Sequence, residues 1–201
     1  MMYLRTFAPW IVYAIIPTHY WEWSALIALC ISVAGIAMQL RAGQKPEALI
    51  IDIGSGVFFA ALTVLAFTDP NTALHAYTPA ISSGVLAVIA GISLAVRVPF
   101  TLPIAKQTTP QELWDNPLFI RTAYVLTSVW TASFAIGCVA LAFLAHDSGP
   151  RTTVQVLAFV IPVVFTLRYV AYIQAKARTL LAQPADPARP SDRIEQNRYD
   201  A

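Results

Sequence analysis

Long apolar stretches separated by short polar loops dominate the chain. A helix of about 20 apolar residues matches the roughly 30 Å hydrocarbon core of a bilayer, and five stretches have about that length or more. They are Trp23–Leu40, Ala48–Phe67, Pro79–Val98, Phe119–Ala145 and Thr153–Ile173. Peptide groups in lipid have no water to bond, so each stretch must be helical. The pattern therefore predicts an all-α, polytopic transmembrane helix bundle.

A shorter apolar stretch, Leu4–Ile16, precedes these five. It has the layout of a signal peptide, but Pro17 and a run of bulky polar and aromatic residues stand where a small-residue cleavage site would be. Pro9 and Trp10 also interrupt it. We expect a retained short helix that is tilted, kinked or partly inserted, and the protein has six spans if this helix crosses the membrane.

The composition agrees with a membrane protein and excludes several other classes. Hydrophobic residues make up 57% of the chain and charged residues only 12%, against roughly a quarter charged in soluble domains. A net charge of +2, with no run of Lys and Arg, gives no indication of nucleic-acid binding. Cys30 and Cys138 both lie in apolar stretches without a CxxC pattern, which predicts neither a disulfide nor a zinc site.

Basic residues are confined almost entirely to alternate loops. Arg41 and Lys45 lie in the loop near residue 43, and Lys176 and Arg178 follow the last stretch. The long loop near residue 109 contains Lys106 and is bracketed by Arg97 and Arg121, whereas Arg151 is alone on the other side. Positive loops stay in the cytoplasm. The sequence thus predicts a multi-pass protein of the bacterial inner membrane with a cytoplasmic C-terminus. Residues 1–180 form the transmembrane domain, and the Pro-rich residues 181–201 form a disordered cytoplasmic tail.

The long basic loop between the third and fourth stretches carries a helix-start pattern. Thr109 is a candidate cap, Pro110 takes the first helical position, and Glu112 is placed to complete a capping box. We expect a short amphipathic helix on the inner membrane surface. Lys106, Glu112 and Trp114 are the residues of this loop that we expect to contact a partner.

Asp52 is the principal candidate for intramembrane chemistry, because a carboxylate in lipid is costly and often functional. Arg168 is its expected partner at similar depth, and Arg97 is the other candidate. Two interpretations stay open. In the first, the role is structural: Asp52 forms an ion pair with one of the arginines or lies at the level of the lipid headgroups. In the second, these residues belong to a proton or substrate relay.

Small and hydroxyl side chains recur within the apolar stretches. Glycines at positions 54, 56 and 84 predict close approach of helices. Hydroxyls at Thr127, Ser128, Thr131 and Ser133 form a polar stripe. Such side chains bond to carbonyls of their own helix, so the stripe does not require a pore.

All three histidines, His19, His75 and His146, fall in the loops on the side that lacks basic residues, accompanied by Glu22, Asp69 and Asp147. If they converge, they would bind a metal or haem or respond to pH. None lies in an HxxxH or HExxH pattern. The chain shows no phosphate loop, catalytic triad or nucleotide motif, so neither an enzyme nor a cofactor is predicted.

Several short patterns together resemble one known family. They are Phe7-Ala8-Pro9, Gln39-Leu40-Arg41, Arg97-Val98-Pro99, a Pro-x-x-x-Trp pattern at Pro110–Trp114, and then Trp130, Phe134 and Gly137. Because these motifs follow one another in this order, the chain resembles the intracellular septation protein A family, which consists of small polytopic proteins of bacterial inner membranes. The inserted residues 115–119 and the long tail depart from the family's pattern. The resemblance implies a role in envelope maintenance and cell division without a catalytic residue set.

Three functions of different classes follow from these features. The first is a non-enzymatic inner-membrane protein that supports envelope integrity or septation by contacting other membrane or division proteins. The alternative is a small-molecule, ion or lipid transporter or channel that uses Asp52. A weaker alternative is a metal or haem site in the histidine-bearing loops.

Overall fold

The described part of the chain is helical. The computed structural model describes residues 2–44 and 46–182, and within them it contains helices but no strand. The α-helices are α1 (Met2–Ile15), α2 (Trp21–Arg41), α3 (Ile50–Thr68), α4 (Leu74–Ala95), α5 (Thr101–Lys106), α6 (Pro117–Phe143) and α7 (Ser148–Ala182). Single 3₁₀ turns are η1 (Thr18–Tyr20), η2 (Pro46–Leu49) and η3 (Gln111–Leu113).

The chain forms two compact units, Met1–Val163 and Val164–Ala201. The first contains α1 to α6 and the beginning of α7. The described part of the second is the rest of α7, where the rings of Phe165 and Tyr169 stack at 5.4 Å. The predicted tail, 181–201, lies outside the described residues except for its first two positions.

Within residues 2–44 and 46–182, five helices are long and apolar enough to cross a membrane: α2, α3, α4, α6 and α7. This confirms the predicted all-α polytopic bundle. The chain is a multi-pass membrane protein with the five expected spans, and α1 is an additional short helix. Three of these helices are longer than predicted, since α2 extends from Trp21 to Arg41, α4 begins at Leu74 and α7 extends from Ser148 to Ala182.

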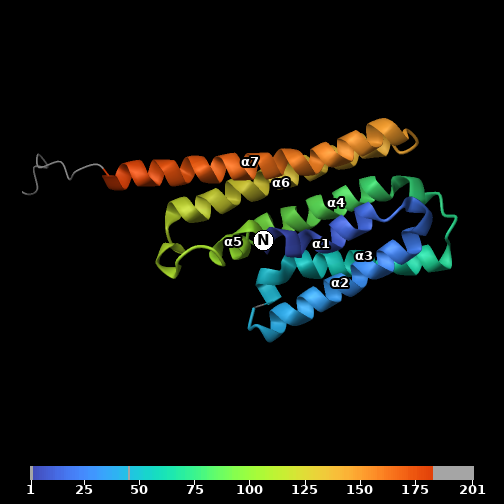
Figure 1. Ribbon diagram of the computed structural model, residues 1–201, viewed down its shortest axis with the longest axis horizontal. Helices are drawn as coiled ribbons and strands as arrows, with labels where there is room; N and C mark the ends of the chain where they lie inside the picture. The colour runs from blue at the N-terminus through green and yellow to red at the C-terminus, as the bar shows by residue number, and fades with distance from the viewer. Residues whose placement is uncertain (1, 45, 183–201) are drawn as a thin grey trace, which may run out of the picture. The chain divides into compact units, whose positions relative to one another are not determined.

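The spans of the first unit run in alternating directions, so its loops gather at two ends (Figure 1). The α2–α3 and α4–α6 connections lie at one end, called here the basic end because it contains Arg41, Arg97 and Lys106. The α1–α2, α3–α4 and α6–α7 connections lie at the opposite end, called the histidine end after His19, His75 and His146.

Helix α1 packs inside the first unit. Phe7 is 3% exposed and stacks on Trp130 of α6, with ring centroids 5.3 Å apart. Trp10 stacks on Phe58 of α3 at 5.1 Å, and its Nε1 donates a hydrogen bond to Ser55 Oγ at 2.8 Å. α1 therefore connects α3 with α6 and is part of the core.

The spans bury many small residues and expose many large aliphatic residues. Ser24, Ala25, Ala28 and Ser55 are at most 2% exposed, whereas Val57, Val64, Val88, Ile136 and Val139 are each at least 59% exposed. Membrane helices pack through small residues and turn aliphatic side chains to lipid. A soluble protein does not expose so many large apolar groups together.

Glycines allow the closest helix contacts, as predicted. A Cβ added at Gly54 of α3 would lie 2.6 Å from Ile89 Cδ1 of α4. A Cβ at Gly84 of α4 would lie 3.0 Å from Cys138 Sγ of α6. Both distances are too short for an unadjusted side chain, so these two glycines set the spacing of α4 from its neighbours.

The predicted capping box at Thr109–Glu112 is wrong. The helix of this loop is α5, ahead of the pattern, and Gln111–Leu113 forms a single 3₁₀ turn that follows Pro110 without a side-chain cap. α6 begins soon afterwards, because Asn116 accepts a hydrogen bond from Leu118 N at 2.8 Å and Pro117 takes the first position. Only the single 3₁₀ turn Gln111–Leu113 therefore fits between Pro110 and the start of α6.

Candidate functional site

The α4–α5 connection at the basic end is fixed to α6 by buried hydroxyl groups. Ser93 Oγ accepts a hydrogen bond from Phe100 N at 3.2 Å. Thr101 Oγ1 donates to Ala123 O at 2.9 Å and lies 2.9 Å from Thr127 Oγ1. The three hydroxyl-bearing residues are at most 1% exposed, and hydrogen bonds are strong in such surroundings without water. The long loop between α4 and α6, called here the fourth loop because α1 is counted as the first segment, therefore starts from a rigid base.

Arg97 ends α4 in a Schellman motif. Its N–H donates to Leu94 O at 3.0 Å and the Val98 N–H donates to Ser93 O at 2.9 Å. Arg97 has φ 60°, a conformation usually occupied by glycine, and Gly43 has φ 78° at the end of α2. The Arg97 carbonyl accepts a hydrogen bond from Tyr124 Oη at 3.2 Å. Its side chain is exposed.

The structure brings two of the three predicted loop residues together. Lys106 Nζ lies 5.0 Å from the ring centroid of Trp114, within cation–π range. The Trp114 indole Nε1 donates to Thr109 O at 3.0 Å. Glu112 is exposed beside Leu113, which is 46% exposed. The loop is thus held from inside and presents Glu112 and Leu113 outward.

Asp52 lies in the first turn of α3 and is half-buried. A carboxylate is favoured there by the helix dipole, typically by about 0.3–1 kcal/mol. Arg168 is exposed on α7 in the second unit. The pairing of Asp52 with Arg168 or Arg97 stays a prediction.

A cavity of about 350 Å³ lies in the first unit, toward the histidine end. It is lined by α1, α4, α6 and the beginning of α7: Trp10, Ile11, Tyr13, Ala14, Ile15, Pro79, Ser82, Ser83, Leu86, Phe134, Thr152, Gln155, Val156, Ala158, Phe159 and Val160. Asp52 is not among these residues. The walls are mainly apolar, and a few hydroxyl and amide groups interrupt them.

Ser82 is the notable polar residue of this cavity. It is 9% exposed, and its Oγ has no hydrogen-bond partner among the described residues. Ser32 Oγ, in α2, is also buried without a partner in this part of the chain but does not line the cavity.

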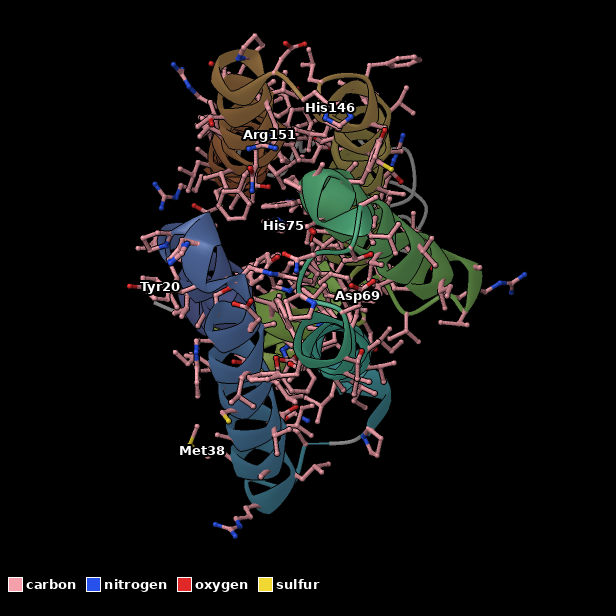
Figure 2. All side chains as sticks on the ribbon, turned by 90° about the vertical axis from the view of Figure 1, so that its right-hand side faces the viewer. Tyr20, Met38, Asp69, His75, His146 and Arg151 are labelled. Carbon is pink, nitrogen blue, oxygen red and sulfur yellow. The ribbon has the colours of Figure 1, made fainter. Side chains whose placement is uncertain are left out.

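The three histidines lie against different aromatic rings. The ring of His75 stacks on Trp21 at 4.7 Å, His146 meets Tyr77 at 5.8 Å, and His19 meets Tyr20 at 4.9 Å. Figure 2 shows the histidine end, with His146 on the α6 side and Tyr20 on the α2 side. In the described part of the chain, no group of three or more His, Cys, Asp or Glu side chains is arranged to hold a metal ion.

Arg151 is the basic residue that departs from the charge pattern, and the structure gives it a local role. Its Nη1 donates to Ala145 O at 3.0 Å, in the turn that joins α6 to α7. A cation at the C-terminal end of a helix satisfies free carbonyls and is favoured by the helix dipole. This contact explains a positive charge at the histidine end.

The cavity was not predicted from the sequence. The chain contains only indirect signals for it, the adjacent serines at 82 and 83 in an apolar span and the aromatic residues of Leu4–Ile16. A cavity depends on how four helices are placed, which the pattern of one helix does not determine.

Comparison of the chain with protein-family models, with curated protein sequences and with solved structures gives no match. The septation-family resemblance therefore stays a prediction from short motifs.

Proposed function

We propose that this chain is a non-enzymatic protein of the bacterial inner membrane that supports envelope integrity or septation by contacting another membrane protein. Its cytoplasmic contact surface would be the fourth loop, with Glu112 and Leu113 at its centre. The observation that carries the proposal is the Lys106–Trp114 contact, which joins the beginning of this loop to its second half and stabilises it.

A fixed loop conformation favours a binding role. Partners bind more tightly when the surface is ordered beforehand, because less conformational entropy is lost on association. The hydroxyl groups of Ser93, Thr101 and Thr127 fix the start of the loop, and Asn116 fixes its end at α6. Between these points an acidic and an apolar side chain point outward.

The transporter alternative with Asp52 has less support from the geometry. The described residues that line the cavity lie toward the histidine end, and Asp52 is not among them. A relay through Asp52 would require a polar path to that carboxylate. We therefore keep partner binding as the main proposal.

A photo-crosslinking residue at position 113 tests the proposal. With a benzoylphenylalanine in place of Leu113 and the chain at its native level in cells, we expect one reproducible protein adduct. Trp114→Ala should reduce its yield several-fold, because the loop loses both the Lys106 contact and the bond to Thr109 O. Mass spectrometry of the adduct identifies the partner, and deletion of either gene should alter cell length or envelope sensitivity in the same way.

The matched control places the same crosslinker at Asn71, which is exposed at the opposite end. It should not give this adduct. The proposal fails if position 113 crosslinks only to lipid, or if Trp114→Ala leaves the yield unchanged.

A further inference from the structure

We propose that the cavity formed by α1, α4, α6 and the beginning of α7 binds a neutral amphiphile, whose hydroxyl or carbonyl oxygen forms a hydrogen bond with Ser82. This binding site is separate from the partner loop, because its lining residues lie toward the opposite end of the first unit. The proposed ligand is a membrane-soluble molecule with an apolar body and one uncharged oxygen-bearing head group.

The size and walls of the cavity fit such a molecule. A volume of about 350 Å³ lies within the range of small-molecule sites, roughly 300–1,000 Å³. Aromatic side chains from three helices, Trp10, Phe134 and Phe159, contribute to the lining. Ligand pockets are typically of this kind, mainly apolar and aromatic with few polar groups that set the orientation.

The lining residues determine the charge of the ligand. Among the described residues that form the cavity there is no Asp, Glu, Lys, Arg or His. A charged group transferred here from water would lose its hydration without gaining a counter-ion, which is strongly unfavourable. The ligand must therefore enter uncharged.

Ser82 indicates where the ligand's polar group would lie. Buried hydroxyls in this protein are generally bonded, as Ser24 is to Trp21 O and Ser93 is to Ala90 O. The Oγ of Ser82 is an exception among the described residues, and Ser82 is one of the residues that line the cavity. A buried hydroxyl without a partner is unfavourable, and a ligand oxygen would remove that penalty.

The cavity rim indicates entry from the lipid. Ile15, Val156 and Val160 line the cavity and are 73%, 53% and 43% exposed. In a membrane, exposed aliphatic side chains on spans face the acyl chains. A molecule dissolved in the bilayer can reach the cavity past these three residues without crossing water.

Photolabelling in vesicles tests the site. The full chain in phosphatidylcholine vesicles is irradiated with a diazirine-bearing octadecanol, and the labelled residues are mapped by mass spectrometry. We expect labels in residues 10–15 and 152–160. Ser82→Ala should reduce labelling about fivefold, the factor that a single hydrogen bond supports. Ala14→Phe, a substitution in the cavity wall, should reduce it further by occupying the space.

Matched controls separate binding from folding. Ser32→Ala removes a second buried, unbonded hydroxyl outside the cavity and should leave labelling unchanged. Both serine variants should melt at or above the wild-type temperature, because each loses an unsatisfied hydroxyl. A Ser82→Ala chain that is stable and labelled as strongly as the wild type overturns the proposal.

Two related probes test the chemistry of the ligand. Diazirine-bearing octadecanoic acid at pH 9 is ionised and should label these residues at least fivefold less than the alcohol. A diazirine-bearing phosphatidylcholine should also label them less. Equal labelling by the ionised acid would show that the site does not select a neutral ligand. Equal labelling by the phosphatidylcholine would show that any acyl chain fills it. Either result overturns the proposal.

Discussion

At the scale of single residues, hydroxyl side chains satisfy the carbonyls that prolines leave free. Pro79 in α4 cannot donate to His75 O, and Thr78 Oγ1 donates to it instead at 2.9 Å. Pro162 in α7 cannot donate to Ala158 O, and Ser133 Oγ of α6 does so at 2.8 Å. Because lipid offers no replacement donor, proline within a span needs such a partner.

The Ser133 bond gives a residue-scale prediction. Ser133→Ala removes the donor to Ala158 O and should lower the free energy of unfolding by about 0.6–2 kcal/mol, the range measured for hydrogen bonds between membrane helices. Unfolding in detergent micelles with increasing dodecyl sulfate measures the change.

Ser24→Ala is the control for this substitution. Ser24 is buried, but its Oγ bonds to Trp21 O within α2, and that carbonyl also accepts a backbone N–H of its own helix. Loss of the Ser24 hydroxyl should therefore lower the free energy of unfolding much less than loss of the Ser133 hydroxyl. Equal decreases in the free energy of unfolding for the two variants would show that the bond from Ser133 to Ala158 O does not stabilise the contact between α6 and α7.

At the scale of elements, α1 determines how the spans of the first unit meet. With 14 residues, α1 is about 21 Å long at 1.5 Å per residue, shorter than the hydrocarbon core. It contributes Phe7 and Trp10 to aromatic contacts with two other helices, Phe7 against Trp130 of α6 and Trp10 against Phe58 and Phe59 of α3. α1 also supplies one wall of the cavity. We infer that this helix is needed for both packing and binding.

A substitution in α1 tests this role. Phe7→Ala removes a ring that is 3% exposed and should destabilise the chain by about 3–5 kcal/mol, as large-to-small changes in cores do. Ile15→Ala on the same helix is the comparison, because Ile15 is 73% exposed and should change stability by less than about 0.5 kcal/mol. Thermal unfolding in detergent measures both. Similar melting temperatures for the two variants would contradict a core position for α1.

The elements also show what could be predicted from the sequence. The five spans were predictable because bilayer thickness fixes the length of an apolar helix. The start of α4 was not predictable, because proline favours the beginning of a helix, whereas Thr78 makes an internal proline tolerable here. Within the polar stripe of α6, Thr131 bonds to its own helix as predicted, but Ser133 bonds to α7 and Thr127 contacts Thr101. Bonds between helices depend on tertiary placement.

At the scale of the whole chain, lipid accounts for the distribution of side chains. Spans with small residues inside and aliphatic residues outside are stable where acyl chains replace water. Charged and titratable side chains gather near the ends of the spans, with Arg41, Arg97 and Lys106 at one end and the histidines at the other. The positive-inside rule predicts that the fourth loop lies in the cytoplasm, and the proposed partner surface depends on that predicted orientation.

Cysteine accessibility tests this orientation most directly. In a chain with Cys30→Ala and Cys138→Ala, single cysteines replace Asn71 at the histidine end or Gln111 at the basic end, both exposed positions. A membrane-impermeant maleimide should label Asn71→Cys in intact cells and Gln111→Cys only after the inner membrane is permeabilised. Labelling of Gln111→Cys from outside intact cells would contradict the account.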